Sequence, residues 1–208
     1  MKGSIAVLDY GIGNLASVAK ALTAIGASVD LVDTAIDPSD YAGIVLPGVG
    51  SFGACARELR RFGFDEVVYS AIEAQLPTLG VCVGLQLLFE GSHESPEVPG
   101  LGIFPGMISK LQCSLPVPQM QWNQLILNDS GTTSRLYTGI ETGAWMYFVH
   151  SYAAPLGDYT TASSHYCVDY TASLERGNLF ATQFHPEKSS KVGLALLSNF
   201  VKLCGQGS

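Results

Sequence analysis

Short apolar runs alternate with helical patterns in the first half of the chain. Ile5 to Leu8, Gly43 to Leu46 and Leu76 to Val81 are largely apolar runs, which are typical of strands covered on both faces. Between them, a strand is expected at residues 28–32, and apolar side chains at helical spacing predict helices at residues 15–25, 54–62 and 64–75. Strands and helices that alternate in this way predict βαβ units and a parallel sheet.

The pattern changes after Glu90. Residues 91–106 are rich in Gly, Pro and Ser and are expected to form a surface loop. Short runs separated by turn residues then predict antiparallel or mixed strands at residues 124–127, 145–149, 160–168 and 180–184. Residues 189–203 have an apolar helical face that should pack on the sheet. We expect an α/β fold, one domain over residues 1–208, whose central, largely parallel sheet is flanked by helices and gains antiparallel strands in the second half.

Composition and charge narrow the class of protein. Hydrophobic residues make up 47% of the 208 residues and charged residues 14%, which is typical of a compact globular chain. The formal charge of −7 argues against a nucleic-acid partner or an anionic membrane surface. Asp9 interrupts the first apolar run too early for a signal peptide, and no run is long enough to span a membrane. We therefore expect a cytoplasmic protein.

The five cysteines form no CxxC pair and leave one thiol over. This spacing is typical of neither a disulfide framework nor a zinc site. We expect reduced cysteines, as in a reducing compartment, and no metal.

Cys82 lies where a predicted strand meets a predicted helix. Gly80 and Gly84 flank it two positions away on each side, which is the thiol version of the sharp turn that exposes a nucleophile. The start of a helix favours the reactive thiolate. Gly11–Asn14 and Pro47–Gly50 also follow strands, so all three segments are expected at the same edge of the sheet. A buried cysteine that packs as a small hydrophobe is the alternative for Cys82.

A cysteine nucleophile needs a base and a group that orients the base. His185 follows a predicted strand, and Glu187 lies two positions further on, so its carboxylate can reach the imidazole ring. A surface His-Pro-Glu turn without a function is the alternative. His93 and Glu94 form a rival pair, but adjacent side chains diverge and their loop is expected to be exposed. His150 and His165 lie in predicted strands and are expected to be structural.

Acyl chemistry at Cys82 also needs hydrogen-bond donors for the developing oxyanion. The Val83 N–H is one candidate, and the loop Gly48–Gly50 can bring a second amide. A tight turn without a ligand also explains this loop.

Gly11 to Ala16 fits the dinucleotide-binding pattern GxGxx(G/A), and Asp30 and Asp33 lie near the position of a ribose-binding acid. The predicted helix begins too early to leave room for a pyrophosphate. Dinucleotide binding is therefore disfavoured.

Taken together, Gly80–Gln86 and His185–Glu187 resemble the triad (class I) glutamine amidotransferases. Five further segments look like signatures of the glutaminase subunits of imidazole glycerol phosphate synthases: Asp9–Leu15, Leu46–Gly53, Met120–Asn123, Tyr147–Tyr152 and Gln183–Ser189. These segments run in order through essentially the whole chain.

The resemblance implies a Cys-His-Glu triad in which Cys82 attacks the glutamine carboxamide, His185 transfers the proton and Glu187 orients His185. It implies oxyanion donors at Val49 and Val83, and a glutamine site formed by Gly50, Gln86, Ser151 and Tyr152. No cofactor is implied. The ammonia would pass to a (βα)8-barrel cyclase subunit of a heterodimer, which makes imidazole glycerol phosphate and aminoimidazole carboxamide ribotide in histidine biosynthesis. The residues at or near that interface would be Asn14, Trp122, Asn123 and Tyr147.

The chain departs from the family pattern at three positions. Gln121 stands where the family usually has glycine, which affects the local interface, while Val83 and Leu85 replace Leu and Met and preserve bulk. One alternative is a triad amidotransferase with another acceptor, such as that of pyridoxal phosphate synthesis, but Asp9–Leu15 and Tyr147–Tyr152 disfavour it. The other alternative is a non-catalytic α/β regulatory subunit, which the intact triad disfavours.

Overall fold

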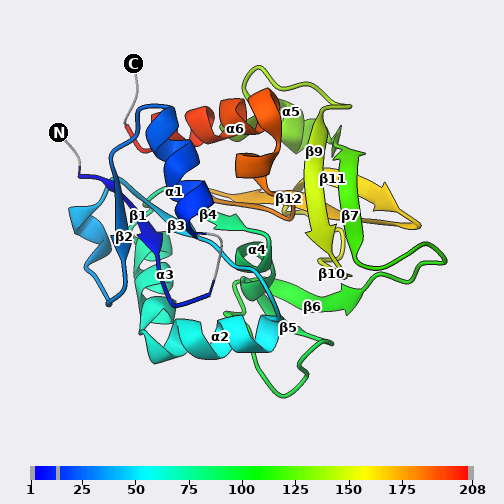
Figure 1. The fold of residues 1–208 in the computed structure, drawn as a ribbon, viewed down its shortest axis with the longest axis horizontal. Coiled ribbons are helices and arrows are strands. Elements are labelled where there is room, and N and C mark those ends of the chain that lie inside the picture. Colours follow the sequence, from blue (N-terminus) through cyan, green and yellow to red (C-terminus); the bar gives the residue numbers. More distant parts are fainter. Residues whose placement is uncertain (1–2, 13–14, 206–208) are drawn as a thin grey trace.

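The computed structural model describes residues 3–12 and 15–205, and an eight-stranded sheet forms their centre (Figure 1). In spatial order the strands are β2 (Val29–Val32), β1 (Ile5–Leu8), β3 (Gly43–Leu46), β4 (Thr78–Val81), β13 (Leu179–Thr182), β12 (Val168–Arg176), β11 (Thr160–Tyr166) and β8 (Ile126–Leu127). The first five run parallel, and the last three are antiparallel additions. The expected α/β fold with a largely parallel sheet is confirmed.

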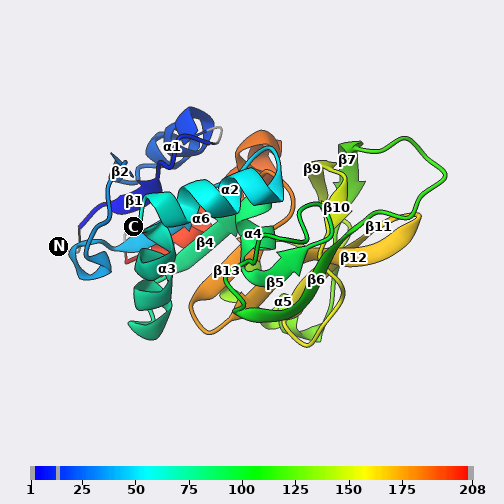
Figure 2. The same cartoon turned by 90° about the horizontal axis from the view of Figure 1, so that it is seen from below.

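Helices cover both faces of the parallel part of the sheet. α1 (Leu15–Ala24) and α6 (Ser190–Leu203) lie on one face, and α2 (Phe52–Arg61) and α3 (Phe64–Glu73) lie on the other (Figures 1 and 2). β1, β3 and β4 are buried along their whole length, which explains why their sequences are apolar without alternation.

The second half of the chain adds two small sheets at one end of the molecule (Figure 1). One contains β5 (Phe89–Ser92), β6 (Phe104–Lys110) and β10 (Tyr152–Ala153), and the other pairs β7 (Gln119–Gln124) with β9 (Trp145–His150). The remaining helical segments are short: α4 (Val83–Leu87), α5 (Asp129–Thr133) and the 3-10 turns Pro38–Asp40, Arg135–Tyr137 and Pro186–Lys188.

Two local expectations differ from the structure. Residues 160–168 form parts of two strands, because Cys167 has a φ of 61° and turns the chain between β11 and β12. The expected loop at residues 91–106 contains the end of β5 and the start of β6. β11 and β12 pair as a hairpin with Tyr166 opposite Val168, and no Gly or Pro marks the turn at Cys167 in the sequence. β5 and β6 pair across the Gly- and Pro-rich segment between them, with Gly91 opposite Met107, so local composition indicated only a loop there.

Cys113 and Cys167 form a disulfide, with 5.3 Å between their Cα atoms. The expectation of reduced cysteines is wrong for this pair, because the fold brings the β6–β7 connection onto the turn between β11 and β12. Cys55, Cys82 and Cys204 are buried thiols. Within residues 3–12 and 15–205, none of the helices has the length and apolar character needed to cross a bilayer.

Candidate active site

Cys82 occupies a strained turn between β4 and α4. Its φ of 56° and ψ of −110° lie outside the regions that residues with a Cβ usually adopt. A Cβ on Gly84 would lie 2.0 Å from the carbonyl oxygen of Leu46, and one on Gly80 would lie 3.0 Å from Gly84. Glycine at both positions therefore allows the strand and the helix to approach closely enough to form the sharp turn that the sequence predicts.

His185 and Glu187 follow β13, the strand next to β4. Nδ1 of His185 lies 3.0 Å from Oε1 of Glu187, and both side chains are almost completely buried. Burial lowers the pKa of His185, but favourable interactions with Cys82 and Glu187 outweigh it and raise the pKa to about 10. The ring is therefore an imidazolium at neutral pH, with Nδ1–H directed at the carboxylate.

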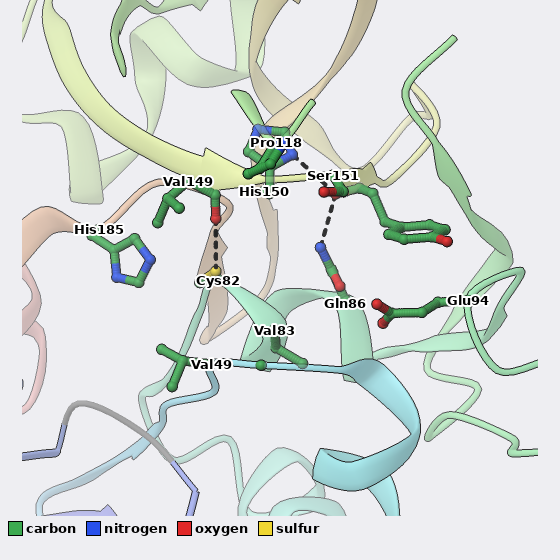
Figure 3. Close-up of a pocket in the computed structure, with 12 residues that line it drawn as sticks. Val49, Cys82, Val83, Gln86, Glu94, Pro118, Val149, His150, Ser151 and His185 are labelled. Atoms are coloured by element: carbon green, nitrogen blue, oxygen red, sulfur yellow. Dashed lines mark hydrogen bonds between the residues drawn. The ribbon is translucent and has the colours of Figure 1, made fainter. Parts of the chain in front are cut away.

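Cys82 and His185 meet at a cavity of about 240 Å³ (Figure 3). The sequence-predicted residues that line it are Val49, Gly50, Cys82, Val83, Gln86, Ser151, Tyr152 and His185. Glu187 lies beside His185 in a small adjoining cavity lined also by Pro47 and Val81. The structure thus brings the predicted nucleophile, base, oxyanion and glutamine-binding residues together from segments that span most of the chain.

Glu94 lines the same cavity, although the sequence analysis considered it only in the disfavoured pair with His93 and not as a site residue. Its Oε2 accepts a hydrogen bond of 2.7 Å from the backbone N–H of Phe52, which fixes the carboxylate on the same side of the cavity as Gln86 (Figure 3). This contact joins residues 42 positions apart, so no local signal could have found it. The neighbouring His93 is exposed and contacts Ser109 instead.

The predicted oxyanion donors are not both free in this conformation. The Val83 N–H donates a hydrogen bond of 3.2 Å to the carbonyl oxygen of Gly48. Two buried side chains also bind the same loop: Cys55 donates to the Val49 carbonyl at 3.4 Å, and Tyr10 donates to the Pro47 carbonyl. Burial raises the pKa of Cys55 to about 12, so its thiol keeps the proton that it donates.

The other two histidines differ in their surroundings. His150 is buried and lines the cavity, and its Nδ1 lies 2.9 Å from the Tyr152 carbonyl oxygen, which makes Nδ1–H the donor. Burial lowers the pKa of His150 to about 4, so this ring is neutral. His165 is exposed and pairs with Asp169. The sequence predicted His150 as structural, but it also forms part of the cavity wall.

The predicted interface residues Trp122, Asn123 and Tyr147 lie on the β7–β9 sheet. Trp122 stacks edge-on against Tyr147, with 6.1 Å between the ring centroids, and the Asn123 amide nitrogen donates to the His165 carbonyl oxygen at 2.8 Å. Met120 and Trp145 are large exposed apolar residues of the same two strands. Together with Trp122 and Tyr147 they form what we term the β7–β9 patch. Asn14 lies outside the described residues.

Gly11 and Asp30, two residues of the candidate dinucleotide pattern, make internal contacts, while residues 13–14 lie outside the described part of the chain. The Gly11 N–H donates to the Asp9 carboxylate at 3.0 Å, and Asp30 accepts a hydrogen bond from Ser4. Among the residues that the structure describes, no three His, Cys, Asp or Glu side chains are grouped as metal ligands.

Comparison with known proteins shows the family of the chain. Residues 6–204 match the family described as Glutamine amidotransferase class-I. A protein of Synechococcus sp. (strain JA-3-3Ab) named Imidazole glycerol phosphate synthase subunit HisH is 46% identical over 203 residues, which cover 95% of this chain and 93% of that protein. The protein of the same name from Deinococcus radiodurans is 44% identical over 200 residues, covering 94% of this chain and 92% of its own length.

Solved structures share the fold. PurLQS from Thermotoga maritima superposes with a TM-score of 0.75 at 21% identity, covering 97% of this chain and 99% of that chain. A structure described as a glutamine amidotransferase gives a TM-score of 0.74 at 20% identity and covers 98% of this chain and all of its own.

Proposed function

Since the chain belongs to the class-I glutamine amidotransferase family, we propose that it is the glutaminase subunit of an imidazole glycerol phosphate synthase. It hydrolyses L-glutamine to glutamate and ammonia, and the ammonia serves the cyclase reaction of histidine biosynthesis. The chain acts as one domain over residues 1–208, in the cytoplasm. We assign the catalytic roles mainly because Cys82 and the buried His185–Glu187 pair lie together at one cavity.

The triad supports a two-step acyl transfer. Cys82 attacks as a thiolate paired with the His185 imidazolium, and its sulfur bonds to the carboxamide carbon. His185 gives its Nε2 proton to the leaving nitrogen, and ammonia departs as the C–N bond breaks. His185 Nε2 then takes a proton from water, which attacks the thioester and releases glutamate with the Cys82 sulfur as leaving group. Nε2 suits both steps because it has no other hydrogen-bond partner among the described residues. Glu187 stabilises the imidazolium and fixes its orientation.

The cavity offers acceptors for the amino-acid end of glutamine. Gln86 Nε2 donates both of its hydrogens, one to the Tyr152 carbonyl at 2.9 Å and one to Gln183 Oε1 at 3.0 Å. Gln86 Oε1 and the Glu94 carboxylate therefore remain as acceptors, which suit the substrate's ammonium group. Gly50, Ser151 and Tyr152 complete the wall of the site.

Oxyanion stabilisation requires a change in the loop before α2. The Val83 N–H becomes available only when its bond to the Gly48 carbonyl opens. Rotation of the Gly48–Val49 peptide would break this bond and turn the Val49 N–H toward the substrate. The present conformation is therefore a resting state. Binding of the cyclase would activate the site if it favoured the rotated peptide.

The β7–β9 patch is the proposed cyclase-binding surface, because a patch of exposed aromatic side chains is typical of a protein interface. It is linked directly to the base. The backbone N–H of His185 donates to the Tyr147 carbonyl at 3.0 Å, and the backbone N–H of Tyr147 donates to Ser189 Oγ at 3.0 Å. Displacement of β9 by the partner would thus reach His185 directly through the first bond, and through the second by way of Ser189, whose hydroxyl donates to the His185 carbonyl oxygen at 2.6 Å.

The test is glutamate release by the purified chain, alone and with the cyclase subunit and its nucleotide ligand. We expect little activity alone and a large increase in the complex, with none in Cys82→Ala or His185→Ala. Both variants should retain ammonia-dependent synthesis, because the cyclase carries out that step.

Strong glutamate release by the chain alone, with no increase on addition of the cyclase, would indicate an amidotransferase of another pathway. No glutamate release in either state would favour a non-catalytic subunit. Full activity in Cys82→Ala would overturn the mechanism.

A further inference from the structure

Gln183 is a completely buried side chain that contacts the nucleophile and has no part in the triad chemistry described above. Its Nε2 lies 3.8 Å from Cys82 Sγ, and its Oε1 lies 3.0 Å from Gln86 Nε2. The Val149 carbonyl oxygen lies 4.0 Å from the same sulfur. That oxygen can accept a proton from a thiol but repels a thiolate. An N–H group from Gln183 does the opposite and attracts the negative sulfur.

The orientation of the Gln183 amide follows from its neighbours. The Tyr152 carbonyl can only accept, so Gln86 must present Nε2 to it at 2.9 Å. The second hydrogen on the same nitrogen then points to Gln183, whose Oε1 must accept it. This leaves Gln183 Nε2 on the side of Cys82. The assignment rests on donor and acceptor chemistry and fixes an N–H group, not an oxygen, beside the sulfur.

His150 anchors the start of this chain of hydrogen bonds. Its Nδ1–H is a second donor to the Tyr152 carbonyl, which holds that oxygen between two donors. The chain then runs from the wall of the glutamine cavity through Gln86 and Gln183 to the sulfur. Its side chains are at most 5% exposed, so bulk water competes little with these bonds.

We propose that Gln183 is a positioning residue for glutamine hydrolysis: its Nε2–H holds the Cys82 sulfur toward the substrate carbon and stabilises its negative charge. This inference rests on the proposed glutaminase function and adds a residue to it. No bond to Gln183 is made or broken. It acts through Cys82, and its amide orientation is set by Gln86.

The test compares Gln183→Met with Gln119→Met, in the full chain and in its complex with the cyclase. Gln119 is a matched control because it is also a completely buried glutamine, bonded to the Tyr170 hydroxyl and outside the cavity lining. Hydrogen bonds to charged groups are strong, so we expect Gln183→Met to lower kcat for glutamine hydrolysis about 10- to 100-fold. KM should change little, and ammonia-dependent synthesis should match the wild type.

Alkylation of Cys82 by iodoacetamide separates this role from a structural one. Loosened packing would expose the thiol and speed alkylation, whereas loss of the N–H donor should slow it about tenfold or more. Gln183→Glu, which keeps the shape and replaces the donor with a carboxylate, should slow it as well and serves if Gln183→Met does not fold. Wild-type or faster alkylation in the folded Gln183 variants, with kcat equal to that of Gln119→Met, would overturn the proposal.

The alkylation assay does not depend on glutamine. If the wild-type complex released no glutamate, the proposed function would fail while the comparison of alkylation rates would still decide the role of Gln183.

Discussion

At the scale of single residues, the protonation of His185 is set by its surroundings. Burial alone would lower its pKa below the ordinary value of 6.5, but interactions with Cys82 and Glu187 raise it to about 10. The folded state therefore holds a proton that the unfolded chain loses above about pH 6.5. The stabilisation from this proton is fully present below pH 6.5 and disappears as the pH rises toward 10.

Glu187→Gln should weaken glutamine hydrolysis without abolishing it, because an amide orients the ring but does not balance its charge. We expect kcat to fall by roughly 10²–10⁴-fold and the alkaline limb of its pH profile to move to lower pH. The measurement is kcat for glutamate release against pH. Asp169→Asn is the matched control, because it removes the carboxylate of an exposed His–Asp pair. An unmoved alkaline limb in Glu187→Gln would contradict the assigned role.

At the scale of elements, the turn between β4 and α4 depends on close packing against β3. Gly84→Ala places a Cβ 2.0 Å from the Leu46 carbonyl oxygen, so α4 must move. We expect a loss of about 1–3 kcal/mol in the free energy of unfolding and a severe loss of glutamine hydrolysis, since α4 carries Val83 and Gln86.

Gly102→Ala is the control for this substitution, because Gly102 has a φ of 65° and open space around it. It should lose stability through backbone strain while keeping activity. Denaturant unfolding and glutamate release measure both effects. Full activity in Gly84→Ala would show that the turn tolerates the shift.

The disulfide between Cys113 and Cys167 fastens the β6–β7 connection, which ends at the cavity residue Pro118. It closes a loop across a separation of 54 residues, so its loss should cost about 2–4 kcal/mol of stability through the entropy of the unfolded chain. Denaturant midpoints with and without a dithiol reductant measure this cost. The Cys113→Ser/Cys167→Ser double variant should have the same denaturant midpoint as the reduced protein, and the reductant should not change it. Equal midpoints for oxidised and reduced wild type would contradict the expected stabilisation.

The sequence predicts those features that depend on neighbouring residues. The apolar runs of β1, β3 and β4 and the glycines around Cys82 have local causes, so the parallel sheet and its sharp turn were predictable. Glu94 reaches Phe52 across 42 positions, and Gln183 reaches Cys82 across 101. Such pairs arise when the strands assemble, and neither periodicity nor local spacing encodes them.

At the scale of the whole molecule, polar and apolar surface are unequally distributed. The chain has a net charge of −7, yet the β7–β9 patch presents Met120, Trp122 and Trp145 with 63%, 44% and 53% of their surface exposed. This patch lies at the end of the molecule opposite to β2 (Figure 1). The uneven distribution favours docking by one end, close to the cavity and to His185.

Trp122→Glu should separate docking from chemistry. The substitution replaces an aromatic anchor by a charge that the complex would bury. We therefore expect the binding free energy for the cyclase to weaken by about 2 kcal/mol or more, which corresponds to a roughly 30-fold higher Kd. Activation of glutamine hydrolysis should then require a higher concentration of cyclase, while iodoacetamide should alkylate Cys82 in the free chain at the wild-type rate. Leu31→Glu is the matched control, because Leu31 is a 53% exposed apolar residue of β2. Titration of activity and binding with cyclase measures both variants. Unchanged affinity in Trp122→Glu, or an equal loss in Leu31→Glu, would place the docking surface elsewhere on the molecule.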